Sequence, residues 1–294
     1  MQWSSLQNSH GRLSRLERSR DAQPVTPTLP VRGGGGAEPV DDRRVDLAAA
    51  HAAPELLAIR DRLLVALAFS SGVFEAICFL SFGKVFTAFQ TGNLVFLGLG
   101  VAGTRPPAGP DPVRVVISLA AFAVGAALAT RILTAFNGDE EKEDSEIFEA
   151  WPRRVSIALC VATVAQVGFL IVWMATSPSS LVSNILVALN AFAMGLQMNA
   201  VRSLHVPGIS TTAATATFIS WVSGITTWTL KPAAARRLTG VLVGMVAGAF
   251  VGDWMLSHAH TYAPLVPVVV IAVVIAIASV TLKQKPALSQ KPSR

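Results

Sequence analysis

The chain has 294 residues, of which 52% are hydrophobic and only 14% are charged, and its formal net charge is +6. Soluble domains carry about 25% charged residues, so this composition argues against an ordinary soluble enzyme or binding domain. The basic residues lie in the tails and in loops beside long apolar runs, a topology pattern that argues against a nucleic-acid partner. The predicted class is a polytopic, all-α membrane protein.

Residues 1–58 are polar and low in complexity, with the stretch PVTPTLP and four consecutive glycines at 33–36. So few apolar residues cannot bury a core, and we expect a disordered cytoplasmic tail with no signal peptide. The segment 283–294 is basic and is expected to be a second cytoplasmic tail. The region 59–282 is predicted to form a single transmembrane domain.

Eight apolar segments occupy this predicted transmembrane domain. Each is close to the roughly 20 residues that a helix needs to cross a bilayer. The segments are 61–82, 85–103, 113–136, 155–176, 181–204, 208–230, 238–257 and 263–282. Length alone therefore predicts eight crossings.

The basic residues favour six crossings. If 85–103 and 208–230 enter the membrane and return on the same side, then the loop 137–154, Lys231, Arg236 and both tails lie in the cytoplasm, as the positive-inside rule requires. Eight crossings would place the loop 137–154 outside. We favour six transmembrane helices plus two Thr-rich re-entrant or tilted segments, with eight helices as the alternative.

Glu75 lies inside the first apolar run, and Ser71, Gly72 and Cys78 share its helical face. An ionisable side chain within a membrane is costly and is a candidate functional residue. An acid that binds and releases a proton is what a proton-coupled carrier requires. A protonated Glu bonded to a neighbouring helix is the structural alternative, and both interpretations remain open at this point.

Polar residues also gather in the two Thr-rich segments. Hydroxyl and amide side chains beside a glycine that permits a helix break are typical of substrate sites in broken transporter helices. Thr and Asn also bond to their own helix or to a neighbouring one, which is the structural alternative. The candidates for a substrate path in these segments are Thr87, Gln90, Thr91, Gly92, Asn93, Thr211 and Thr215.

The segment 181–204 adds two further candidates for this path, Gln197 and Asn199. Asn190 and Gln197 are seven residues apart and share one helical face, whereas Asn199 lies on the other side. The polar side chains of this helix therefore point in two directions.

The segment 238–257 has glycines at every fourth position, namely Gly240, Gly244, Gly248 and Gly252. Such a row of small residues lets another helix approach closely, so it predicts helix packing within the chain or a homodimer. It carries no chemistry of its own.

No enzymatic or cofactor motif of the Walker, Rossmann or H-E-x-x-H type occurs, and we expect neither an enzyme nor a cofactor. Asp253, His258 and His260 form a weak constellation near a helix end, and no metal site is expected there. Cys78 and Cys160 both lie inside apolar runs, so a disulfide is not expected.

The order of segment types indicates an internal repeat of about 61–176 and 181–282. A shift of 124 residues lays Thr87 on Thr211 and Glu75 on Asn199, while a shift of 123 lays Gly125 on Gly248. Three crossings per half would make the repeats inverted, a plan common among transporters. Four per half would make them parallel, and the absence of any repeat remains an alternative.

The acid in the first helix, the stretch FTAFQTGNLVFLGLG and the later GLQMNAVRSL together resemble the YoaK family of small multi-pass bacterial membrane proteins. The resemblance covers about residues 60–282, and the family typically carries Asp where this chain has Glu75. It implies a polytopic fold in the bacterial inner membrane. It implies no substrate, because the family's activity is not established.

These observations predict a transporter or channel for a small solute or ion, with Glu75 as the candidate carrier of a coupled proton. Its expected partners are the lipid bilayer and an unidentified small solute, and a second copy of the chain is a candidate partner in a homodimer. The alternative is a membrane scaffold or sensor that binds partners through the glycine row of 238–257.

Overall fold

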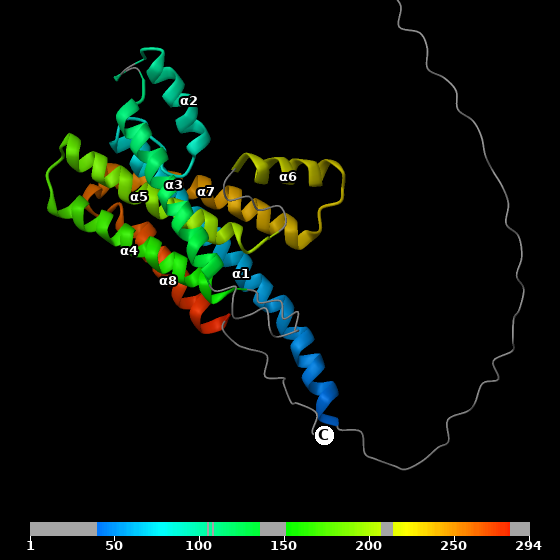
Figure 1. Cartoon of the computed structure of the whole chain (residues 1–294). Coiled ribbons are helices and arrows are strands. Elements are labelled where there is room, and N and C mark those ends of the chain that lie inside the picture. The colour runs from blue at the N-terminus through cyan, green and yellow to red at the C-terminus, as the bar shows by residue number, and fades with distance from the viewer. Residues whose placement is uncertain (1–39, 105, 108, 136–150, 207–213, 283–294) are drawn as a thin grey trace, which may run out of the picture. The chain divides into compact units, whose positions relative to one another are not determined.

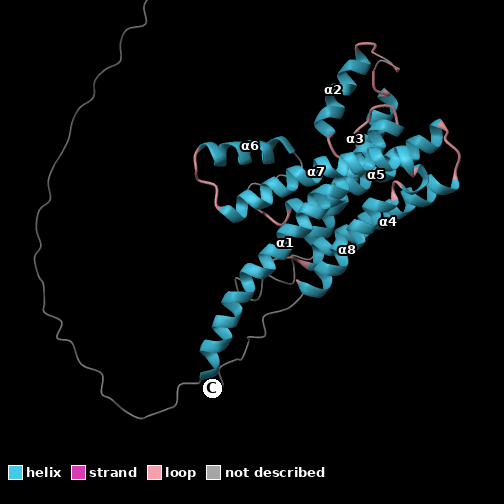
Figure 2. Cartoon of the chain, turned by 180° about the vertical axis from the view of Figure 1, so that it is seen from behind, coloured by secondary structure: helices cyan, strands magenta, loops and turns pink. Residues whose placement is uncertain are grey.

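The computed structural model describes residues 40–104, 106–107, 109–135, 151–206 and 214–282. The described part is helical and contains no strand (Figure 2). The chain divides into two units, Met1–Arg43 and Arg44–Arg294, and all the contacts below lie within the second. The predicted tail at 283–294 and residues 1–39 lie outside the described residues.

Six long helices dominate the fold (Figure 1), and they supply six segments long and apolar enough to cross a membrane, the last of which, His260–Thr281, combines η1 with α8. They are α1 (Val40–Ser81), α3 (Pro112–Ala135), α4 (Arg153–Ala175), α5 (Ser180–Arg202), α7 (Pro232–His258) and α8 (Leu265–Thr281). The short 3-10 helix η1 (His260–Tyr262) leads into α8. Helix α1 begins at Val40, so residues 40–58 are helical where the sequence predicted a disordered tail; the apolar candidate span within α1 starts at Pro54.

The remaining helices, α2 (Gln90–Val101) and α6 (Ala214–Thr226), have 12 and 13 residues. At 1.5 Å per residue they are about 18–20 Å long, too short for a hydrocarbon core of about 30 Å. They fall within the two segments predicted to be re-entrant or tilted. The sequence placed the first of these segments at 85–103, but its helix begins only at Gln90.

The direction of α5 relative to α1 decides between six and eight crossings. Gln197 donates a hydrogen bond to the Ser71 hydroxyl, and Asn190 donates one to the Cys78 sulfur. Residue numbers rise along α1 as they fall along α5, so the two helices are antiparallel. Eight crossings would make the first and fifth helices parallel. The antiparallel arrangement agrees with the six long apolar helices and with six crossings, and it does not fit eight.

Helix α7 packs along α1 through its four glycines. A Cβ atom at Gly240 or Gly244 would contact Val65, and one at Gly248 would overlap the backbone carbonyl of Phe69. The row continues with Gly252 against the backbone of Val73. The glycine row is thus a packing surface within the chain, and α1 occupies the face that a second copy would need.

Helices α3 and α5 cross in the same way. A Cβ at Gly125 would overlap the carbonyl of Phe192, and one at Gly195 would overlap the carbonyl of Phe122. Gly72 of α1 faces the Met245 carbonyl of α7 in the corresponding manner. Both crossings therefore depend on a glycine from each helix.

The two crossings share one register. Gly72 and Gly195 are 123 positions apart, and so are Gly125 and Gly248. Near the ends of these two crossings, Asp61 and Asn184 are also 123 positions apart, as are Arg114 and Arg237. Arg237 of α7 lies 3.4 Å from Asp61 of α1, and Arg114 of α3 donates to Asn184 of α5 over 3.3 Å.

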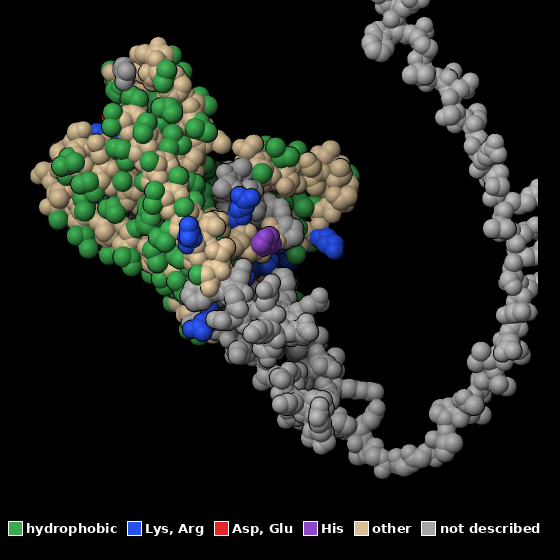
Figure 3. Space-filling view, in the orientation of Figure 1, with side chains coloured by type: hydrophobic (Ala, Val, Ile, Leu, Met, Phe, Trp, Pro, Cys, Tyr) green, Lys and Arg blue, Asp and Glu red, His purple; other side chains and the backbone are tan. Residues whose placement is uncertain are grey.

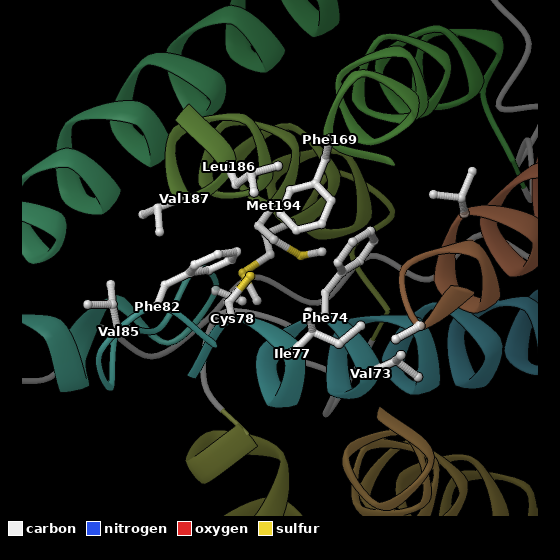
Figure 4. Packing of buried hydrophobic residues seen from close by; sticks show 14 of the residues in the cluster. Val73, Phe74, Ile77, Cys78, Phe82, Val85, Phe169, Leu186, Val187 and Met194 are labelled. Atoms are coloured by element: carbon white, nitrogen blue, oxygen red, sulfur yellow. The ribbon is translucent and has the colours of Figure 1, made fainter. Parts of the chain in front are cut away.

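Aromatic and aliphatic side chains fill the interior where α1, α4 and α5 meet (Figure 4). Phe74 of α1 points toward Phe169 of α4, with ring centroids 5.6 Å apart, and Met194 of α5 lies beside them. Large apolar side chains also cover the outside, as Figure 3 shows in green, including Val246 and Phe250 of α7. An apolar exterior is expected of a protein that faces lipid.

Candidate functional site

The chain leaves helical geometry between α1 and α2, at residues 82–89, yet this turn lies in the protein interior. Val85, Thr87 and Ala88 are all buried, and Lys84 has a φ of +62° that turns the chain sharply. Non-helical backbone at membrane depth requires partners for its N–H and C=O groups. Two polar side chains supply most of them.

Glu75 binds the second half of this turn. One carboxyl oxygen, Oε1, accepts hydrogen bonds from the Thr87 hydroxyl over 2.6 Å, from the Thr87 N–H over 2.9 Å and from the Ala88 N–H. The side chain is 4% exposed, and its other oxygen, Oε2, has no hydrogen-bond partner among the described residues. Glu75 thus fixes the turn with one oxygen and leaves the other unused.

Asn190 extends this arrangement to α5. Its amide nitrogen donates to the Thr87 hydroxyl over 2.8 Å and to the Cys78 sulfur over 3.2 Å. The hydroxyl of Thr87 therefore links an acid of α1 to an amide of α5. The amide oxygen of Asn190, like Oε2 of Glu75, has no partner in the described part of the chain.

Asn93 binds the first half of the turn. Its side-chain oxygen accepts from the Phe86 N–H over 3.1 Å, and its nitrogen donates to the Phe86 carbonyl over 2.7 Å. Ser118 of α3 donates to the same carbonyl, and Gln90 donates to Ser118 and to the Thr87 carbonyl. Asn93 and its neighbours therefore pair the backbone of the turn.

Gly92 and Thr91 have different places in this arrangement. A Cβ at Gly92 would come within 2.9 Å of the Phe86 ring, so glycine is needed for that ring to pack. Thr91 is exposed. Of the Thr-Gly-Asn triplet, the glycine and the asparagine hold the turn in place, whereas the threonine side chain lies at the surface.

The other predicted candidates are dispersed. Gln197 donates to the Ser71 hydroxyl over 3.0 Å at the α1–α5 contact, about one helical turn before Glu75. Asn199 instead bonds to the Ala126 carbonyl and the Thr130 hydroxyl of α3, away from α1. Thr215 is exposed, and Thr211 lies outside the described residues.

Sequence reasoning missed three buried polar residues, Ser70, Ser118 and Gln166. All lie in apolar runs, and a Ser in a helix usually bonds to its own backbone, so none carried a signal. Gln166 of α4 is fully buried, and both of its side-chain polar atoms lack a partner among the described residues.

The unpaired atoms gather on three neighbouring helices. Glu75 Oε2, Asn190 Oδ1, Gln197 Oε1 and both polar atoms of Gln166 belong to α1, α5 and α4. A buried polar atom without a hydrogen bond costs about 1–3 kcal/mol, so such groups normally meet water or a ligand. Each of these four side chains is therefore a candidate for contact with water or a ligand.

The histidines near the end of α7 have other partners. His258 stacks on Trp254 and His260 on Trp173, with ring centroids 4.9 and 4.7 Å apart. Within the described ranges, no three His, Cys, Asp or Glu side chains are close enough to hold a metal ion. Cys78 and Cys160 are free thiols.

Comparison with known proteins gives two matches. The model of a family described as "Protein of unknown function (DUF1275)" matches residues 63–277. The "UPF0700 transmembrane protein YoaK" of Bacillus subtilis (strain 168) is 33% identical over 168 residues, covering 57% of this chain and 68% of the relative. No solved structure matches.

Proposed function

Since the chain belongs to the DUF1275 family, whose members have no described function, we propose from its site that it is a transporter or channel for a small solute or ion. Glu75 is the residue through which a proton couples to the movement of that solute. The proposal depends on one observation above all. A buried acid, with an unused oxygen, lies where two antiparallel membrane helices meet.

A purely structural acid would be a poor explanation for this arrangement. Three donors bind Oε1, and a neutral amide could accept from the two backbone N–H groups equally well. An acid in the membrane is costly, and such residues mark ion or proton pathways. Glu75 and Asn190 both bind Thr87 through their other side-chain atoms. Their unpaired oxygens, Oε2 and Oδ1, add acceptor capacity that the described contacts of the fold do not use.

A second support is the common separation of the two glycine crossings. We infer that α1–α4 and α5–α8 are inverted repeats, because the α1–α7 and α3–α5 crossings are related by one separation of 123 positions. Three crossings per half reverse the direction of the second half. Inverted repeats with interrupted helices near the midplane are a common transporter plan.

The register also identifies which residues correspond. At a separation of 123, the counterpart of Glu75 is Met198, whereas the shift of 124 considered from the sequence gave Asn199. Asn93 and Ser118 likewise fall on Ala216 and Val241, although Thr87 falls on Ser210. The proposed repeat therefore rests on the glycines of the crossings and little on the site.

We place the protein in the bacterial plasma membrane with both ends of the transmembrane domain in the cytoplasm. Six crossings bring the start of α1 and the end of α8 to one side. The basic residues Arg131, Arg153, Arg202 and Lys231 lie on that same side. Basic residues accumulate on the cytoplasmic side of membrane proteins. Among the described residues, Arg114 falls on the other side and Lys84 lies in the turn before α2; Arg105, the other exception expected from the sequence, lies outside the described residues.

The test is to reconstitute the full chain in liposomes and to compare wild type with Glu75→Gln across a panel of small solutes at several pH values. The amide retains an acceptor oxygen for the Thr87 and Ala88 N–H groups but cannot exchange a proton. We expect the variant to keep its thermal stability and to lose the solute-dependent proton movement. Equal, pH-dependent fluxes in both proteins would remove Glu75 from the mechanism.

The scaffold alternative required the glycine row of α7 to be free for a partner helix. All four glycines of the row face α1 of the same chain, so they are not available to a partner helix.

A further inference from the structure

A shallow apolar groove runs along the outside of the molecule between α4 and α8, which lie side by side (Figure 1). It is open to the surroundings and has a volume of about 410 Å³. Four residues of α4 and two of α8 form its wall, namely Cys160, Thr163, Val164, Val167, Ala272 and Ile275. None of these side chains carries a formal charge, so the groove is suited to an apolar occupant.

The groove lies at the depth of the hydrocarbon core of the bilayer. Its wall comes from the middle of α4 and the middle of α8. Both helices belong to segments long and apolar enough to cross the membrane, so their middle turns lie among lipid acyl chains. A membrane lipid is therefore the molecule that meets this groove.

The polar atoms of the wall do not select a polar occupant. The Thr163 hydroxyl donates to the Leu159 carbonyl of its own helix over 2.8 Å, and the Cys160 thiol is a weak donor. An acyl chain needs no hydrogen bond, but it gains no hydrophobic free energy by leaving other lipids, because lipid tails are as apolar as this wall. A lipid retained in the groove therefore needs a second contact, through its headgroup.

Arg153 offers that second contact. It is the first residue of α4, its side chain is exposed, and it has no ion-pair partner among the described residues. Ile157, Cys160 and Val164 follow it at intervals of four, three and four residues, so all four lie along one stripe of the helix. Ile157 is 39% exposed and Val164 is 72% exposed, which places the stripe on the outside. The groove therefore leads along α4 toward an exposed basic side chain.

We propose that the α4–α8 groove binds one anionic phospholipid, with an acyl chain between the two helices and the phosphate at Arg153. Val164 lies 11 residues beyond Arg153, which is about 16 Å along the helix axis. Half of the hydrocarbon core is about 15 Å thick, so an acyl chain whose headgroup is at Arg153 reaches the groove. The guanidinium group binds phosphate oxygens through parallel N–H donors, and a headgroup of net negative charge is attracted more strongly than a zwitterionic one.

This lipid site does not depend on the proposed transport function. In the topology proposed above, the bound lipid belongs to the cytoplasmic leaflet, because Arg153 begins α4 on that side. The two contacts have separate roles, since the groove holds the chain and Arg153 selects the headgroup.

The test counts the lipids that the full chain retains. The protein is reconstituted in bilayers of equal parts phosphatidylglycerol and phosphatidylcholine with identical acyl chains, released into mild detergent and measured by native mass spectrometry. We expect one retained lipid per chain, with phosphatidylglycerol in about fivefold excess, as one basic residue beside an anionic headgroup provides. Retention of both lipids without preference would overturn the proposal.

One pair of variants tests the headgroup contact. Arg153→Gln removes the charge at the start of α4, and its control Arg236→Gln removes one from an exposed position near the start of α7. We expect Arg153→Gln to abolish the preference for phosphatidylglycerol and Arg236→Gln to keep it.

A second pair tests the groove. Ala272→Phe fills the groove from α8, and its control Val273→Phe enlarges the next residue, which is 49% exposed and lies outside the wall. We expect at least a fivefold loss of retained lipid in Ala272→Phe and none in Val273→Phe.

The outcomes are independent of Glu75. All four substituted side chains are exposed, so the variants leave the packed interior intact, which thermal unfolding in detergent checks. Unchanged headgroup preference in Arg153→Gln, or unchanged retention in Ala272→Phe, would overturn the assigned site. Glu75→Gln should retain the lipid as wild type does, whatever its effect on transport.

Discussion

Asn93 pairs both backbone polar groups of Phe86, a task that a helix or sheet neighbour performs elsewhere in a protein. Replacing it with Leu would leave a buried N–H group unpaired and the Phe86 carbonyl with only Ser118. At about 1–3 kcal/mol for each unpaired group, the turn before α2 would be substantially weakened.

We therefore expect Asn93→Leu to lower the unfolding free energy by about 2–4 kcal/mol, measured by thermal unfolding in detergent. The matched control is Thr91→Ala, two residues away on an exposed side chain, which should change stability by less than about 0.5 kcal/mol. Equal stability of the two variants would contradict the role assigned to Asn93.

The candidate site was partly predictable at the level of residues. The sequence identified Glu75, Thr87, Gln90 and Asn93 because polar side chains in apolar runs are conspicuous. It did not reveal that the side chains of Glu75, Gln90 and Asn93 bind the backbone of the turn at residues 86–88, since that turn is set by tertiary contacts. The unused oxygens of Asn190 and Gln197 could not be predicted, because they depend on how each amide is oriented by its partner.

At the scale of helices, the crossing of α1 and α7 has little room. A Cβ at Gly248 would overlap the Phe69 carbonyl, so even Ala requires the two backbones to separate. Gly98 of α2 is the opposite case, because no atom lies within 4 Å of the position its Cβ would take.

Gly248→Ala should therefore lower the unfolding free energy by about 1–3 kcal/mol, as overpacking does elsewhere. Gly98→Ala should raise it by up to about 1 kcal/mol, because Ala favours helix over Gly. Gly125→Ala, at the equivalent crossing, should cost about as much as Gly248→Ala. A Gly125→Ala variant as stable as wild type would contradict the equivalence of the two crossings.

The orientation of the helices has its own test, with single cysteines placed in a background where Cys78 and Cys160 are replaced. Ser177 is exposed between α4 and α5, and Thr229 is exposed between α6 and α7. Ser177→Cys should react with an impermeant thiol reagent added to intact cells. Thr229→Cys should react only after the membrane is opened. The reverse pattern would invert the proposed topology.

Six crossings were predictable because charged residues are excluded from the bilayer and remain visible in the loops. The packing partner of the glycine row could not be predicted, since a row of small residues can pack against a helix of the same chain or of another chain. Helix periodicity did place Asn199 on a different face of α5 from Asn190, and the structure directs it to α3. Its inclusion in the substrate path therefore gains no support from the geometry.

At the scale of the whole molecule, the two halves are interleaved. Helix α1 of the first half packs on α7 of the second, and α3 of the first packs on α5 of the second. Each half alone would expose its glycine faces and its polar atoms to lipid. Neither half is an independent folding unit.

Cutting the chain in the exposed turn after Thr176 should therefore give two fragments that are unstable alone and stable together. We expect each fragment to be degraded when expressed singly, and the pair to copurify when expressed in the same cell. A fragment that accumulates alone in a folded, monodisperse form would contradict the interleaved arrangement.

The pairing of α1 with α7 also has a consequence for how the protein is made. Ribosomes add about 5–20 residues per second, so the roughly 150 residues between the end of α1 and the start of α7 take on the order of ten to thirty seconds to synthesise. During that time α1 is already in the bilayer, and the face around Gly72 that packs on α7 has no partner. The nascent helix must be sheltered by the insertion machinery or by a chaperone, and mutations that slow the emergence of α7 would lengthen its exposure to membrane proteases.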